Sequence, residues 1–224
     1  MIKLVAFDWN GTLLSDTAPT LRAENEALRA VGLKPITILK FRQTFDIPIM
    51  TYWKALGLSE LVLKRHMQTI EDVFHLNYEK FANQARTRAG AKELLVYLGG
   101  HKIQSVIYSN HNIPNIHRQL VRLDIGKFIC KILANDIGEN KQVMERHKEK
   151  RLLEFIRERG FSPRQVISIG DTEEEIQVGK QYGYHTVAIT GGYNTTSRLK
   201  KQHPDFLIHN LAEVKGIIKK LNNA

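Results

Sequence analysis

The chain has 224 residues, of which 42% are hydrophobic and 25% are charged, and this composition predicts a folded protein with a substantial core. Lysines and arginines outnumber acidic residues and give a formal net charge of +10, but they are spread along the chain without interleaved aromatic residues. Nucleic acid is therefore not favoured as a partner. No apolar run approaches the roughly 18 residues of a membrane span, and the amino-terminal run is too short for a signal peptide. We expect a cytoplasmic protein with no membrane partner.

The chain contains one cysteine, so an internal disulfide is excluded, which agrees with a reducing compartment. Cys130 falls in the apolar segment KFICKILA. A cysteine in such a segment is most often a small core residue. We therefore expect Cys130 to be buried and assign it no catalytic role.

Four short apolar runs predict β-strands that are buried on both faces, as in a parallel sheet. Helix-like segments at 89–98, 148–159 and 173–182 precede the second, third and fourth of these runs. This alternation predicts a doubly wound α/β domain, mainly parallel, whose ligands bind at the carboxyl ends of the strands. The runs are 3–7 (KLVAF), 104–108 (QSVIY), 165–169 (QVISI) and 185–189 (HTVAI).

A stretch of about seventy residues after the first predicted strand contains no good strand run and is expected to be helical. An insertion at this place would lie over the strand ends as a lid. The predicted organisation is a core domain of residues 1–16 and 88–224 and a helical cap domain of residues 17–87. The expected cap helices are 19–31, 47–56, 60–68 and 70–83.

Polar motifs follow three of the predicted strands: Asp8-Trp9-Asn10-Gly11-Thr12-Leu13, then Ser109-Asn110, then Gly170-Asp171-Thr172-Glu173-Glu174-Glu175. A lysine near the head of segment 148–159 lies between the second and third motifs. In this order they resemble the four motifs of the haloacid dehalogenase-like (HAD) hydrolase superfamily. The helical insertion is similar to the small cap of its phosphoglycolate phosphatase and β-phosphoglucomutase branch. The resemblance covers nearly the whole chain and implies a HAD-like, Rossmannoid fold.

The resemblance also implies a phosphatase that acts on a small phosphorylated metabolite with Mg²⁺ as its cofactor. Asp8 would be the nucleophile that attacks phosphorus and forms an aspartyl-phosphate. Asp8 and Asp171 would be the carboxylate ligands of Mg²⁺, joined by the backbone carbonyl of Asn10. Glu175 would ligate the metal directly or through a water molecule, although acids are also favoured at the start of a helix for electrostatic reasons.

The phosphate group would be bound from the neighbouring motifs. Ser109 would donate its hydroxyl to a phosphoryl oxygen, helped by the backbone N–H of Asn110 at a helix start. Thr12 caps the turn of the first motif and belongs to the same phosphate-binding set. Lys148 aligns best as the catalytic, phosphate-binding cation, with Lys150 as the alternative. His111 is close enough in sequence to reach the substrate, but a lone loop histidine is more often structural.

Asn10 departs from the family pattern at a catalytic position. Phosphatases of this superfamily have an aspartate there, which protonates the leaving oxygen and then activates the hydrolytic water. A carboxamide does neither, and such acid–base help is worth about 10² to 10⁴ in rate. The site is thus expected to be slowed or specialised. Asp16 would replace the missing proton carrier only if it turned back into the site, and Lys54 in the cap leaves open a Schiff-base chemistry like that of phosphonoacetaldehyde hydrolases.

Two functions follow from these residues. The first is the Mg²⁺-dependent phosphatase with an aspartyl-phosphate intermediate. The alternative is a catalytically weak HAD-fold protein with a binding or regulatory role, which the amide at position 10 keeps open. The identity of the substrate and the oligomeric state are open at this level.

Overall fold

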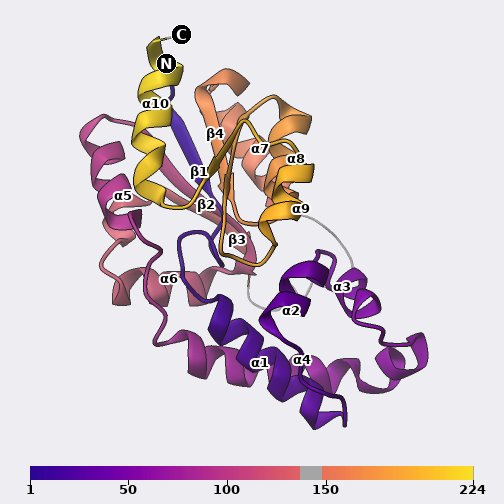
Figure 1. The fold of residues 1–224 in the computed structure, drawn as a ribbon. Coiled ribbons are helices and arrows are strands. Elements are labelled where there is room, and N and C mark those ends of the chain that lie inside the picture. Colours follow the sequence, from indigo (N-terminus) through magenta and orange to yellow (C-terminus); the bar gives the residue numbers. More distant parts are fainter. Residues whose placement is uncertain (137–147, 224) are drawn as a thin grey trace.

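The computed structural model describes residues 1–136 and 148–223. Within these residues six strands form one parallel sheet in the order β3-β2-β1-β4-β5-β6 (Figure 1). The predicted α/β fold with a doubly wound parallel sheet is therefore confirmed. The strands are β1 (Leu4–Phe7), β2 (Gln104–Asn112), β3 (Lys131–Asn135), β4 (Val166–Gly170), β5 (His185–Ile189) and β6 (Phe206–Ile208).

Helices cover both faces of the sheet because successive residues of each strand point to opposite sides. On one face Val5 and Phe7 of β1 belong to a hydrophobic cluster with residues of α5, α6 and α10. On the other face Leu4 and Ala6 pack with residues of α7, while α8 and α9 pack with β5. The helices are α5 (Ala91–Gly100), α6 (Ile113–Arg122), α7 (Lys148–Glu158), α8 (Glu173–Tyr182), α9 (Thr196–Lys201) and α10 (Val214–Asn223), with short 3₁₀ turns η1 (Gly126–Phe128), η3 (Pro163–Gln165) and η4 (Leu211–Glu213).

The central position of β1 decides where the first motif lies. Phe7 is in register with Ile107 of β2 and with Ile169 of β4. The next residue, Asp8, donates its backbone N–H to the Ile169 carbonyl at 2.9 Å. The chain therefore leaves the sheet between the carboxyl ends of its two neighbouring strands, where the second and fourth motifs also emerge.

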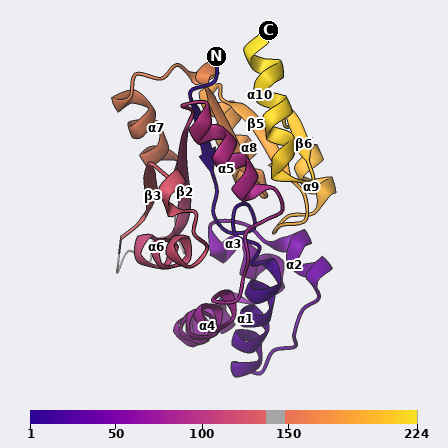
Figure 2. The same cartoon turned by 90° about the vertical axis from the view of Figure 1, so that its left-hand side faces the viewer.

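The helical insertion consists of four helices between β1 and α5, which lie together at one end of the sheet (Figures 1 and 2). It has an apolar cluster of its own that includes Phe41, Tyr52, Trp53, Leu63 and Ile70. The chain division at residues 17 and 87 stays a prediction. The helices are α1 (Thr17–Ala30), α2 (Ile38–Thr44), α3 (Ile49–Ala55) and α4 (Glu60–Ala82). No helix among the described residues is long and apolar enough to cross a membrane.

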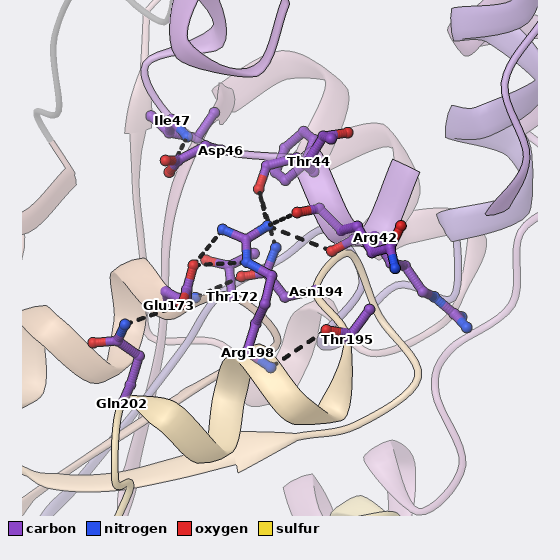
Figure 3. Close-up of polar contacts among 12 residues, drawn as sticks. Arg42, Thr44, Asp46, Ile47, Thr172, Glu173, Asn194, Thr195, Arg198 and Gln202 are labelled. Atoms are coloured by element: carbon purple, nitrogen blue, oxygen red, sulfur yellow. Dashed lines mark hydrogen bonds and ion pairs between the residues drawn. The ribbon is translucent and has the colours of Figure 1, made fainter. Parts of the chain in front are cut away.

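Polar contacts attach the insertion to the core beside the strand ends (Figure 3). Arg198 of α9 donates from Nη1 to the Phe45 carbonyl at 2.6 Å and from Nε to Glu173 of α8 at 2.8 Å. Asn194 donates from its side chain to the same Phe45 carbonyl at 3.2 Å, and Arg42 donates from Nε to the Gly192 carbonyl at 2.8 Å. These bonds hold the segment after α2 against the loop that follows β5.

Several local expectations were wrong. The short edge strands β3 and β6 were missed, because at the sheet edge a strand is not apolar throughout. Helix α2 was also missed, and the two helices expected at 60–68 and 70–83 are the single helix α4. Cys130 is exposed rather than buried, because it directly precedes edge strand β3.

Strand β2 is longer than expected, and this changes the setting of the second motif. It continues to Asn112, with an irregular register beyond Tyr108, so Ser109 and Asn110 lie in the strand. Helix α6 begins only at Ile113, where the Asn112 side chain accepts a hydrogen bond from the backbone N–H of Asn115 at 3.0 Å. The expected helix start at Asn110 was therefore wrong.

Candidate active site

Asp8 lies at the bottom of the site and is 6% exposed. Its Oδ1 is 3.3 Å from Nζ of Lys148, the first residue of α7. Burial raises the pKa of Asp8 well above its usual value, while the positive charge of Lys148 opposes this rise. The structure therefore places the predicted nucleophile and the predicted cation side by side, and the alternative Lys150 is exposed.

Lys148 is buried among three carboxylates. Its Nζ is 2.9 Å from Oε2 of Glu174 and also forms an ion pair with Glu175. Burial alone lowers the pKa of Lys148, but the charges of Asp8, Glu174 and Glu175 outweigh it and raise the pKa well above its usual value. Lys148 is therefore a permanent cation. The sequence did not single out Glu174, because three successive acids at a helix start give no sign of which one turns inward.

Glu175 is occupied by contacts within its own helix turn. Its Oε2 accepts hydrogen bonds from the backbone N–H of Thr172 at 3.0 Å and from the Thr172 hydroxyl at 2.6 Å, while Oε1 contacts Lys148. The bond from the Thr172 backbone belongs to the capping box of α8. The arrangement favours a link to a metal through a water molecule over direct ligation.

Asp171 follows β4 and is held by both of its oxygens. Oδ1 accepts a hydrogen bond from the Thr12 hydroxyl at 2.7 Å, and Oδ2 accepts one from the backbone N–H of Tyr193 at 2.6 Å. Gly11 and Gly192 permit this close approach, since a Cβ at either position would lie 2.2 or 2.1 Å from Asp171 Oδ2. Burial, and then the charge of Glu175, raise the pKa of Asp171 to about 7.

The charge balance of the site fits a divalent cation. Asp8, Asp171, Glu174 and Glu175 are buried carboxylates, and Lys148 is the buried cation among them. Hard carboxylate and carbonyl oxygens are the donors that Mg²⁺ prefers, and it needs few protein ligands because it retains water molecules. Within the described residues no group of three or more His, Cys, Asp or Glu side chains is placed to hold a metal ion by side chains alone. Asp8 and Asp171 with the Asn10 carbonyl are therefore the set that could hold Mg²⁺.

The second motif contributes a buried hydroxyl. Ser109 is 2% exposed, and its Oγ accepts a hydrogen bond from the backbone N–H of His111 at 3.2 Å. The Asn110 side chain donates to Oε2 of Glu174 at 3.2 Å, so it supports the acidic partner of the lysine. His111 packs edge-on against Tyr78, with ring centroids 5.6 Å apart. Burial lowers the pKa of His111 to about 4, so this side chain is neutral at physiological pH.

The Asn10 side chain is hydrogen-bonded to Asp16, the carboxylate that the sequence left open as a replacement proton carrier. Its Nδ2 donates to Oδ2 of Asp16 at 2.7 Å and to the Tyr78 hydroxyl at 2.7 Å. Asp16 is fully buried and does turn back toward the first motif. Its Oδ1 accepts from the backbone N–H of Gly11 at 2.7 Å, and its Oδ2 accepts from the hydroxyls of Tyr78 at 2.7 Å and Tyr193 at 2.9 Å.

These contacts explain why an amide suits position 10. Burial raises the pKa of Asp16, while the hydrogen bonds from Asn10 and its other donors oppose the rise and favour the ionised form. An aspartate at position 10 would instead bring two carboxyl groups together. Nothing in the sequence pointed to the two tyrosines, which come from α4 and from the loop after β5. Lys54 pairs with Glu60 at the surface, at 3.3 Å, and takes no part in this site.

One cavity of about 400 Å³ connects the strand ends with the insertion. At the core end it is lined by Asp8, Asn10, Ser109 and Lys148. Its walls toward the insertion come from α1, α3, α4 and the segment after α2. The residues there include Glu24, Phe45, Ile47, Ile49, Trp53, Glu71, Phe74 and Tyr78.

Comparison with known proteins agrees with the fold and with the motifs. Residues 5–189 match the family model described as haloacid dehalogenase-like hydrolase. The phosphoglycolate phosphatase of Haemophilus influenzae (strain ATCC 51907 / DSM 11121 / KW20 / Rd) is 22% identical over 223 residues, which cover 96% of this chain and 98% of the relative. That of Vibrio vulnificus (strain YJ016) is 24% identical over 237 residues, covering 97% and 96%.

The fold is also similar to that of a solved haloacid dehalogenase-like family hydrolase from Streptococcus pneumoniae. The TM-score is 0.81 at 20% sequence identity, with 97% of this chain and 98% of the other covered. At this identity the likeness supports the fold alone. The family model, however, spans most of the chain and includes Asp8, Ser109, Lys148 and Asp171. The chain therefore belongs to the haloacid dehalogenase-like hydrolase family, within which it is a phosphatase.

Proposed function

We propose that this phosphatase depends on Mg²⁺ and hydrolyses a small phosphorylated metabolite through an aspartyl-phosphate on Asp8. The observation that carries the proposal is the contact of buried Asp8 with Lys148 at 3.3 Å, beside Asp171 and at the end of the cavity. A nucleophile for phosphorus needs neighbouring positive charge, because the phosphoryl group and the carboxylate repel each other. When bound by Asp8, Asp171 and the Asn10 carbonyl, Mg²⁺ would neutralise charge on the phosphoryl oxygens.

The proposed reaction has two steps. An oxygen of Asp8 attacks phosphorus in line, and the bond from phosphorus to the leaving oxygen breaks with its electron pair on that oxygen. Water then attacks the phosphorus of the aspartyl-phosphate, which releases inorganic phosphate and restores the Asp8 carboxylate. Ser109 would donate its hydroxyl to a phosphoryl oxygen in both steps. The insertion would act as the cap that excludes bulk water from the cavity.

Asn10 has no proton to give, so the leaving oxygen would take its proton from water. The amide instead holds Asp16 through the 2.7 Å hydrogen bond. The reaction would thus be slow with alkyl phosphates, whose leaving alkoxides need a proton. It would be less affected with acyl phosphates, whose leaving carboxylates do not.

The experiment is release of inorganic phosphate from p-nitrophenyl phosphate and acetyl phosphate, with Mg²⁺ and with a chelator. We expect release that needs Mg²⁺ and is abolished in Asp8→Asn. The matched control is Asp124→Asn, because Asp124 is an exposed residue paired with Lys92, and this variant should keep full activity. Metal-independent release would contradict the cofactor assignment, and no release from either compound would favour the alternative of a binding or regulatory protein.

A further inference from the structure

The cavity above Asp8 is lined on the side of the insertion by acidic residues that the chemistry at phosphorus does not use. Glu24 of α1 lines the cavity and is only 4% exposed. Among the described residues, the donors beside Glu24 are the indole N–H of Trp53 and the hydroxyl of Tyr52, whose contacts with the carboxylate are too poorly aligned to count as full hydrogen bonds. Both donors are neutral, and a buried carboxylate is nearly always paired with positive charge, so this one, which lines a cavity, indicates a missing cation.

What Glu24 lacks among the described residues is a cationic partner. Burial raises the pKa of Glu24 to about 7, and the hydrogen bonds offered by the Trp53 and Tyr52 side chains lower it by less. A carboxylate accepts hydrogen bonds and attracts positive charge, which would offset the cost of burial. Glu71 of α4 also lines the cavity, and its buried Oε1 has no partner among the described residues.

The charges along the cavity are unsuited to a substrate with a second anionic group. Lys148 is the one lysine or arginine among the described lining residues, and it is already paired with the carboxylates around Asp8. Burial lowers the pKa of both lining histidines, His75 and His111, so they supply little positive charge. A carboxylate on the leaving group would therefore face Glu24 and Glu71 without a cationic partner.

The apolar walls of the cavity suit an apolar body with a cationic end. Phe45, Ile47, Ile49, Trp53 and Phe74 are among the lining residues. Aromatic faces attract cations, indole most strongly. A volume of about 400 Å³ is within the range of about 300–1,000 Å³ for pockets that bind drug-sized ligands, and is more than a two-carbon acid needs.

We propose that the substrate is a phosphate monoester of an amine, whose leaving group has an apolar body and an ammonium group that binds Glu24 at the far end of the cavity. Phosphate and ammonium would then bind at opposite ends, with the apolar part between Trp53 and Phe74. Phosphoglycolate, the substrate named for the bacterial relatives, would be a poor substrate because its carboxylate has no partner there. The proposal rests on the proposed phosphatase function, since the phosphate end is assigned from it.

The test uses three phenyl phosphates with the same leaving oxygen and para side chains that share the ethylene group next to the ring. They are 4-(2-aminoethyl)phenyl phosphate, 4-propylphenyl phosphate and 3-(4-phosphonooxyphenyl)propanoate. A charge-assisted hydrogen bond is worth roughly a factor of ten or more. We expect kcat/KM to be at least about tenfold higher for the ammonium compound than for the neutral one, and lowest for the carboxylate.

Glu24→Gln should bring the ratio of kcat/KM for the ammonium compound to kcat/KM for the neutral compound close to one, because the substitution removes the carboxylate charge and keeps the shape of the side chain. The matched control is Glu26→Gln on the same helix, whose exposed side chain pairs with Arg29, and this variant should keep the ratio. Should Glu24→Gln fail to fold, judged by circular dichroism, the half-buried Glu71 offers Glu71→Gln, which should also lower the ratio.

Binding of the free alcohols, tyramine and 4-propylphenol, is measured by calorimetry as a readout that needs no turnover. Tyramine should bind more tightly, and only while Glu24 is intact. Equal turnover of the three phosphates would overturn this proposal while the phosphatase function stands. No turnover, with tyramine binding that depends on Glu24, would overturn the proposed function and support the ammonium site. No turnover and equal binding of both alcohols would overturn both.

Discussion

The substitution Asn10→Asp tests the role assigned to the amide most directly. In the protein, Nδ2 of Asn10 donates to Oδ2 of Asp16 at 2.7 Å. In the variant an oxygen replaces this nitrogen, so two carboxyl groups face each other inside the protein. Because two ionised carboxylates at this separation repel strongly, the pair should share one proton at neutral pH. The backbone carbonyl of residue 10 is unchanged, and the metal site should persist.

The retained proton sets the size of the expected effect. General acid help at its lower bound of about 10² in rate corresponds to about 2.7 kcal/mol of activation free energy, at 1.36 kcal/mol per tenfold. Raising the pKa of the pair lowers the free energy of unfolding by about 1.4 kcal/mol for each pKa unit once the shared proton has been released. The variant keeps this free energy at low pH, where the proton is bound, and loses it as pH rises through the raised pKa. Activity gained and stability lost should therefore both depend on the same proton.

The assay compares kcat/KM for an alkyl phosphate and for acetyl phosphate. Asn10→Asp should speed the alkyl phosphate by up to about 10²-fold and acetyl phosphate by less, since its leaving group needs no proton. The unaltered protein should accumulate phosphate on Asp8 after mixing with a good donor, because the second step also lacks acid–base help. Unchanged alkyl phosphate turnover in the variant, without a trapped phosphoenzyme in the unaltered protein, would refute this reasoning.

A double variant separates the proton from the local charge. Asn10→Asp combined with Asp16→Asn exchanges amide and carboxylate, so one amide again donates to one carboxylate. The carboxylate at position 10 then has no acidic neighbour to raise its pKa. The gain in alkyl phosphate turnover should appear at lower pH than in the single variant. Coincident pH profiles would show that the Asp16 contact does not control the proton.

Asp171→Asn should remove Mg²⁺ affinity, measured by calorimetry, together with activity; full Mg²⁺ affinity would disprove the assignment. Lys148→Met should abolish turnover and lower the free energy of unfolding by roughly 3–5 kcal/mol, because it leaves Glu174 and Glu175 buried without their cation; an unchanged urea midpoint would contradict this. Because burial raises the pKa of Glu24 to about 7, its contribution to stability is fully present below its usual pKa and lost as pH rises through 7. Relative to Glu24→Gln, the unaltered protein should thus lose about 3 kcal/mol of unfolding free energy between about pH 5 and pH 9. Urea unfolding that gives parallel curves of this free energy against pH for the two proteins would contradict the expectation.

Local patterns in the chain were enough to predict the fold and the residues at the strand ends. Buried strands and amphipathic helices are encoded by the periodicity of neighbouring residues, so β1, β4 and β5 were found within a residue of their bounds. In a parallel sheet the carboxyl ends of strands meet at one edge. The approach of Asp8 to Asp171 and Lys148 therefore followed from the order of the motifs.

The partners of those residues were decided only by tertiary structure. Asp16 and Asn10 are six positions apart, but Tyr78 and Tyr193 reach them from α4 and from the loop after β5. Such contacts depend on how helices cross and where loops return, which no short-range periodicity encodes. The same holds for Glu24, an ordinary acid on an amphipathic helix until α3 and α4 close over it. Packing buries its carboxylate and thereby makes an unremarkable glutamate the acidic end of the cavity.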